Sequence, residues 1–200
     1  LVTLSFKAVM EDNQTKTALA GGLGDAYRTL TWLPSDEIAV TSGWYNYARL
    51  ANVNTEEAEI ANFVGEAEYH ETYYAVYPYT AVSSWQEYGS KVWVNVPVRQ
   101  VYAENTFATD MNPMVARGAR NETLQFKNLC GLLQIEIADE NARELVITSS
   151  SNLAGKVSVT FTPGVPTIKE TQSSFVNRIA ITLNGADTYY VSVLPGELED

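Results

Sequence analysis

The chain contains 200 residues and carries a formal net charge of −11 at neutral pH. This length is enough for one large β domain or two small ones, and 46% hydrophobic with 18% charged residues is typical of a folded chain, so wholesale disorder is excluded. The 13 basic residues are scattered along an acidic chain, which excludes the clustered cationic surface that a nucleic-acid partner requires.

The first expected element is a strand over Leu1–Val9. Apolar residues alternate there with polar ones, which is the two-residue period of a strand with one buried and one solvated face. The apolar face consists of Val2, Leu4, Phe6 and Ala8. We expect these four side chains to point into a core and the residues between them to face water.

Further strands are expected where alternation, or a run of β-branched and aromatic residues, lies between turn signals. They are Tyr27–Trp32, Glu37–Thr41, Glu71–Tyr79, Lys91–Val96, Pro113–Ala116, Leu124–Ile137, Glu144–Ser149, Gly155–Phe161, Phe175–Leu183 and Tyr189–Leu194. The stretch Leu124–Ile137 organises the chain, and its interruption predicts a bend or bulge near Leu129–Gly131.

Three local signals predict what lies between the strands. A capping-box pattern predicts a short helix over Asn54–Ala61. Ala81–Ser90 is expected to be a loop, and Asn184-Gly185 predicts a two-residue hairpin turn joining the last two strands.

The whole pattern, short strands separated by turn signals, predicts an all-β chain built as an antiparallel sandwich or barrel. We expect a single domain over residues 1–200, with long aromatic-rich loops in its first half and at most one short helix. No linker or fixed repeat divides the sequence.

The sequence contains no group of residues that points to catalysis. His70 is the only histidine and Cys130 the only cysteine, so the several nitrogen or sulfur ligands of a zinc site are missing. Cys130 follows Leu129 and precedes two more leucines, which is typical of a small buried hydrophobe. We expect no catalytic residue, no metal site and no cofactor.

Aromatic residues in the expected loops allow two interpretations. They are Trp44, Tyr45, Tyr47, Trp85 and Tyr88. Exposed rings on loops form a flat platform for a sugar or a protein partner, and Trp44, Tyr45, Trp85 and Tyr88 are the candidate ligand platform. The alternative interpretation is that these rings cover the open ends of a sandwich.

Six segments, taken in order, resemble the fimbrillin-like family of Bacteroidales-type bacteria, the Mfa-like and FimA-like pilus subunits. They are Thr31–Val40, Tyr73–Thr80, Val96–Gln100, Leu124–Ile137, Glu144–Val159 and Tyr189–Gly196. The resemblance extends over nearly all of Val2–Gly196. It implies a transthyretin-like antiparallel β-sandwich, exported as a lipoprotein to the outer membrane or cell surface.

The resemblance also implies how the subunits join. In polymerising members of the family, an Arg-specific protease removes the first strand, and a strand from the next subunit fills the groove. Here the exchangeable strand would be Leu1–Val9, with Val2, Leu4, Phe6 and Ala8 filling its pockets. Arg28 is the candidate processing site, and the alternative is that Arg28 is an ordinary charged residue of the second strand.

One departure from the family concerns the end of the chain. Fimbrillins usually carry a second sandwich domain and a C-terminal donor segment, whereas this sequence stops at Asp200. The chain is therefore expected to correspond to the family's N-terminal domain, either as part of a longer protein or as a shorter relative. Shaft, tip and anchor positions in a pilus all stay open.

These expectations combine into two functional hypotheses, and a third, an enzyme, has little support in the sequence. The first is a structural or adhesive subunit of cell-surface fimbriae, with other fimbrial subunits as partners in a homo- or hetero-polymer and a host protein or glycan as a further partner. The second is a cell-surface glycan-binding module that uses the loop aromatics. No stretch approaches the roughly 20 apolar residues of a transmembrane helix, so membrane contact is expected only through an upstream lipid anchor.

Overall fold

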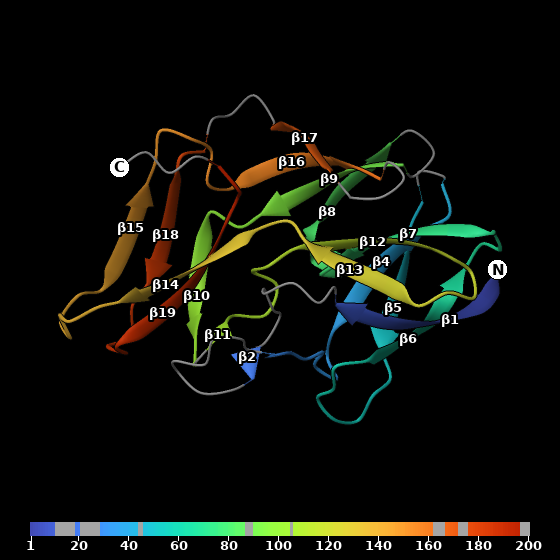
Figure 1. Ribbon diagram of the computed structural model, residues 1–200, viewed down its shortest axis with the longest axis horizontal. Helices are drawn as coiled ribbons and strands as arrows, with labels where there is room; N and C mark the ends of the chain where they lie inside the picture. The colour runs from blue at the N-terminus through green and yellow to red at the C-terminus, as the bar shows by residue number, and fades with distance from the viewer. Residues whose placement is uncertain are drawn as a thin grey trace.

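The computed structural model describes residues 1–10, 19–20, 29–43, 46–86, 90–104, 106–161, 167–171 and 176–196. Strands dominate the described chain, and its one helical element is a single 3₁₀ turn, Tyr79–Ala81. The predicted all-β class is therefore confirmed, with sheets packed in a sandwich-like or barrel arrangement. In Figure 1 the start of β1 lies at one end of the long axis, and β15 and β18 lie at the other.

Seven strands close into a barrel in the order β1-β13-β12-β7-β4-β5-β6. Their bounds are β1 Val2–Met10, β4 Glu37–Thr41, β5 Ala48–Asn52, β6 Ala61–Ala67, β7 Thr72–Tyr77, β12 Met114–Ala119 and β13 Leu124–Asn128. Most neighbours are antiparallel, as the alternating sequence predicts, but β1 and β13 run parallel. Closure pairs most of the edges that an open sheet would present to other chains, apart from the first half of β1 on its β13 side.

An aromatic cluster fills the barrel and is centred on Trp32, which is completely buried. Its indole meets the rings of Phe63, Tyr77 and Phe126 edge to face, with centroids 5.1 to 5.3 Å apart. Trp32 precedes β4 and forms a two-way backbone bridge with Ala58, between β5 and β6. The tryptophan therefore fills the barrel from the end where β4 begins and β5 stops.

A buried carboxylate lies at this same end. Asp36 is 2% exposed, and its two carboxylate oxygens accept hydrogen bonds from the Leu33 backbone N–H at 2.7 Å and the Tyr77 hydroxyl at 2.9 Å. Burial raises the pKa of Asp36 to about 6, because the charged form loses its hydration, although both hydrogen bonds favour the carboxylate. Asp36 thus ties the turn before β4 to the end of β7.

Three smaller sheets surround a second core. One contains β8 Val82–Gln86, β9 Lys91–Val96, β16 Gly155–Thr160 and β17 Thr167–Thr171. Another contains β10 Arg99–Ala103, β11 Thr106–Phe107, β15 Glu144–Thr148 and β18 Arg178–Thr182, and the third pairs β14 Gly131–Glu136 with β19 Thr188–Val193. A further two-stranded sheet pairs β2 Leu19–Ala20 with β3 Thr29–Leu30.

Gln100 joins two of these sheets. Its side-chain NH₂ donates to the Ser192 carbonyl at 2.7 Å, and its side-chain oxygen accepts from the Ser192 backbone N–H at 3.0 Å. The amide therefore stands in for a neighbouring strand at the edge of β19, and it satisfies two backbone groups that are buried there.

The two cores share β7 and β12 as a common wall. Successive side chains of a strand point to opposite faces. Ala75 and Ala116 accordingly belong to the barrel core, whereas Val76 and Val115 belong to the second core. The barrel and the smaller sheets are therefore packed through one pair of strands that is buried on both faces.

The predicted interruption of Leu124–Ile137 is confirmed, and at this point the chain passes from the barrel core to the second core. The stretch consists of two strands, β13 in the barrel and β14 in the second group, separated at Leu129 and Cys130. Cys130 is buried in the second core, and burial raises the pKa of its thiol to about 12. The cysteine therefore packs as a small hydrophobe.

The predicted helix over Asn54–Ala61 is wrong. Asparagine side chains satisfy the backbone groups of this segment: Asn52 Oδ1 accepts from the Asn54 N–H at 3.1 Å, and Asn54 Nδ2 donates to the Ile60 carbonyl at 2.7 Å. Such local bonds compete with helical ones, and β6 begins at Ala61.

Two other local predictions also fail. The expected loop Ala81–Ser90 contains β8, which pairs with β9. The expected hairpin at Asn184-Gly185 does not form, because β18 pairs with β10 and β15 while β19 pairs with β14. The Tyr189 hydroxyl instead accepts the backbone N–H of Asn184 at 3.0 Å, which holds the connection as a loop.

Candidate functional site: the β1 slot and the barrel-mouth pocket

The first strand contributes three side chains to the barrel core. Leu4, Phe6 and Ala8 are 5%, 1% and 0% exposed, and the Phe6 ring meets Tyr73 edge to face with centroids 5.3 Å apart. Val2, at the start of the strand, is 36% exposed. We call the space occupied by these four side chains the β1 slot.

The two edges of β1 are bonded to different extents. Along β6 it forms seven antiparallel residue pairs, from Val2–Ala67 to Ala8–Ala61. Along β13 it forms only three parallel pairs, from Ala8–Leu124 to Met10–Phe126. The first half of β1 is therefore paired on one side only.

The burial of β1 is large compared with the stability of a typical domain. Burying a leucine or phenylalanine side chain contributes about 1.5–3 kcal/mol, so Leu4 and Phe6 together contribute about 3–6 kcal/mol. Whole domains are stable by only about 5–15 kcal/mol. A barrel that lost β1 would expose this slot and would need another apolar strand to fill it.

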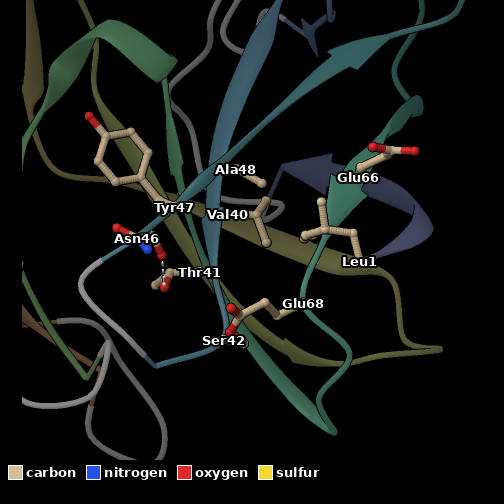
Figure 2. A pocket seen from close by; sticks show the side chains of 10 residues that line it. Leu1, Val40, Thr41, Ser42, Asn46, Tyr47, Ala48, Glu66 and Glu68 are labelled. Atoms are coloured by element: carbon tan, nitrogen blue, oxygen red, sulfur yellow. Dashed lines mark hydrogen bonds between the residues drawn. The ribbon is translucent and has the colours of Figure 1, made fainter.

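A cavity of about 210 Å³ opens at the mouth of the barrel next to the start of β1. We call it the barrel-mouth pocket, and Figure 2 shows its lining. It lies where β4 and β6 end and where β1 and β5 begin, opposite the end that Trp32 fills. The lining residues are Leu1, Val40, Thr41, Ser42, Asn46, Tyr47, Ala48, Glu66, Ala67 and Glu68.

The pocket has an apolar floor and a polar rim. Val40 and Ala67 are buried, and Figure 2 shows the side chains of Leu1 and Val40 next to each other. On the rim, the Thr41 hydroxyl donates to the Asn46 carbonyl at 2.8 Å and closes the turn between β4 and β5. Such a pocket suits a ligand with an apolar stem and a polar end.

Glu68 supplies negative charge at this rim. Its side chain is exposed and lies beside Ser42 in Figure 2, whereas the carboxylate of Glu66 points away from the pocket. Neither glutamate forms an ion pair with another residue of the described chain. The rim therefore offers acceptors, and its lining residues include no lysine or arginine side chain.

Tyr73 connects the slot to the pocket. Its ring packs against Phe6, and its hydroxyl donates to the Glu68 carbonyl at 2.9 Å and accepts the His70 N–H at 2.8 Å. One buried side chain thus contacts the strand that fills the slot and fixes the backbone of the glutamate on the rim.

The structure places the predicted site residues in different environments. Leu4, Phe6 and Ala8 point into a core, whereas Val2 lies partly in solvent at the strand end. The prediction that Trp85 is an exposed loop residue is wrong, because it belongs to β8. Its side chain is 3% exposed and stacks on Phe161 with ring centroids 6.2 Å apart. Its ring is therefore unavailable as a binding platform.

The other predicted site residues lie outside the described chain. They are Arg28, Trp44, Tyr45 and Tyr88. Among the described loop aromatics, Tyr47 is 37% exposed and lines the barrel-mouth pocket.

Glu66 and Glu68 were not among the site residues predicted from the sequence. Their signal is present, because the two glutamates flank the buried Ala67 at a two-residue spacing. The sequence does not indicate that the end of β6 would lie beside the end of β4 and the start of β5.

No three His, Cys, Asp or Glu side chains in the part of the chain that the structure describes lie close enough to hold a metal ion. No helix in the described ranges is long and apolar enough to cross a membrane.

Comparison of the chain with protein-family models, with curated proteins and with solved structures found no match in any of the three.

Proposed function

We propose that this chain is a structural subunit of cell-surface fimbriae that accepts a β-strand from a neighbouring subunit in place of β1. The partner is another fimbrial subunit, of the same or a different kind, and the polymer has an adhesive or structural role. Such a subunit would be exported and held at the outer membrane by an upstream lipid anchor. The chain acts by binding and not by catalysis.

The observation that carries this proposal is the burial of β1. Leu4, Phe6 and Ala8 occupy the core of a closed barrel, while the residues between them are exposed. An incoming strand with the same alternation would recover both the main-chain bonds to β6 and the apolar contacts of the slot. Main-chain bonds supply affinity in this mode of recognition, and alternating pockets supply specificity.

The unequal edges of β1 support exchange. Only three residue pairs hold it to β13, so opening that side breaks few backbone bonds before the slot is reached. β1 is the first strand in the sequence, and β2 follows it after residues 11–18. A single cut between β1 and β2 would leave β1 held only by non-covalent contacts.

Strand exchange in a cut chain tests the proposal. A protease site is introduced within residues 11–18 and cleaved, and the cut protein is mixed with a fluorescent peptide that copies residues 1–10. We expect the peptide to enter at one per chain, measured by fluorescence anisotropy and size-exclusion chromatography. The matched control peptide carries Phe6→Asp and should not enter, because a buried unpaired carboxylate is costly.

Two outcomes bear against the proposal. The first is a fully cut chain that keeps its circular dichroism spectrum and takes up neither peptide over days. The second is equal uptake of both peptides, which would show that the slot does not select the strand.

Processing is tested separately. An Arg-specific protease should release the N-terminal segment of the wild-type chain, and Arg28→Lys should prevent that release, as measured by intact mass. Cleavage elsewhere, with residues 1–28 retained, would remove Arg28 from the proposal and leave strand acceptance standing.

A further inference from the structure

The barrel-mouth pocket has properties that select one kind of occupant. Its volume of about 210 Å³ lies below the roughly 300–1,000 Å³ of ordinary small-molecule sites. It lies next to the start of β1, because Leu1, the residue before that strand, forms part of its wall. When β1 leaves, this wall leaves too, and the incoming strand must supply a replacement at the same position.

The register of β1 places that replacement next to Glu68. Val2–Ala67 is the last pair of the antiparallel ladder, so the position before β1 lies one step beyond it, where Glu68 follows β6. Directly opposed side chains in such a ladder lie close enough to interact, and opposite charges there are favourable. In this chain the position holds Leu1, which is 87% exposed and leaves the carboxylate without a partner.

The lining matches a long basic side chain. The apolar floor of Val40, Ala48 and Ala67 would cover an aliphatic stem, as lysine and arginine stems do elsewhere on protein surfaces. The rim offers several oxygen acceptors, those of Glu68, Ser42 and Asn46. A guanidinium group carries five N–H donors in a fixed plane and satisfies such a set better than an ammonium group does.

We propose that the barrel-mouth pocket binds an arginine side chain of the incoming strand, at the position aligned with Leu1. This inference rests on the proposed function and adds a rule for the partner: a basic residue immediately before the apolar alternation. The pocket thereby fixes the register of the incoming strand, because a shift by two residues would take the charge away from Glu68.

The intact chain provides a test that needs no strand exchange. Leu1→Arg is compared with Leu1→Gln, each alone and combined with Glu68→Gln, by urea unfolding. We expect Leu1→Arg to favour the folded state about two- to fivefold over Leu1→Gln, as an opposed charge pair in a sheet does. The gain should disappear with Glu68→Gln and in 1 M salt.

Glu56→Gln is the matched control. Glu56 is exposed between β5 and β6 at the opposite end of the barrel, so it changes the net charge equally without touching the pocket. Combined with Glu56→Gln, the gain from Leu1→Arg should survive. Loss of the gain in both backgrounds would overturn the inference, because net charge alone would explain it.

The cut chain then compares two peptides that copy residues 1–10 with Leu1→Arg or Leu1→Gln. The arginine peptide should bind about two- to fivefold more tightly, and Glu68→Gln in the cut chain should abolish the difference. Equal binding of both peptides would overturn the inference and leave the proposed function intact.

Failure of both peptides to enter has a different meaning. That result would contradict the proposed function, because no incoming strand would bind, whatever the unfolding experiments on the intact chain show. Stabilisation of the intact chain by calcium or by a monosaccharide, sensitive to Glu68→Gln and without coupling to Leu1→Arg, would assign the pocket to that ligand and overturn the inference.

Discussion

Replacement of Phe6 by alanine measures how much the barrel depends on its first strand. The Phe6 side chain is 1% exposed and packs edge to face on Tyr73, inside a cluster of fully buried rings. Truncation of a buried phenylalanine removes its transfer free energy and leaves a cavity, which together cost about 3–5 kcal/mol. We expect a loss of about 4 kcal/mol in the free energy of unfolding, a large share of what a typical domain has.

Urea denaturation followed by circular dichroism is the assay, with Ser5→Ala as the matched control. Ser5 is the neighbouring residue of β1 and faces water, so its truncation should change the free energy of unfolding by less than about 0.5 kcal/mol. The denaturant dependence should be similar in both variants. A loss below about 1 kcal/mol for Phe6→Ala would refute the idea that β1 is an integral part of the core.

Three further predictions concern other parts of the fold. Burial raises the pKa of Asp36 from 3.8 to about 6, so between these pH values the folded chain binds a proton that the unfolded chain does not. The free energy of unfolding should therefore fall as the pH rises through this window. The fall should be larger in the wild type than in Asp36→Asn, by at most about 3 kcal/mol. Parallel pH profiles of the two proteins would contradict this prediction. Gln100→Ala leaves the buried N–H and carbonyl of Ser192 unpaired and should cost about 2–5 kcal/mol in urea unfolding, whereas the exposed Gln125→Ala should cost almost nothing. Trp85→Ala should lower the free energy of unfolding by about 3–5 kcal/mol because the ring is buried, and a fully stable variant would contradict its place in the core.

Patterns confined to one strand were predictable from the sequence. Alternation in residues 1–9 identified Leu4, Phe6 and Ala8 as buried, because neighbouring positions of a strand must face opposite ways, but it wrongly included Val2, which is 36% exposed at the strand end. The interruption near Gly131 was also readable, since a glycine inside a strand pattern often marks a break. What the sequence did not contain is that the break separates two cores.

Pairings between distant segments were not predictable. The turn signal at Asn184-Gly185 is local, whereas the partners of β18 and β19 are set by packing with β10, β15 and β14. Trp85 was misplaced for the same reason, since only its pairing with β9 and its stacking on Phe161 make it a core residue.

The barrel-mouth pocket belongs to this second class of features. Its lining comes from the starts or ends of β1, β4, β5 and β6, and the pairing of β1 with the distant β6 is not marked in either strand. Single-strand patterns mark Glu68 as exposed, and they carry no information about Val40, which lies about 28 residues earlier in the chain.

Polymer formation is the most direct measure of the central claim, that the β1 slot can be refilled by a strand from another molecule. A copy of residues 1–10 is fused after Asp200 in a chain that carries the protease site within residues 11–18, and sedimentation velocity is recorded before and after cleavage. We predict a monomer before the cut and, after it, a ladder of oligomers that is absent when the fused copy carries Phe6→Asp. A completely cut and folded chain that stays monomeric at high concentration would contradict the claim.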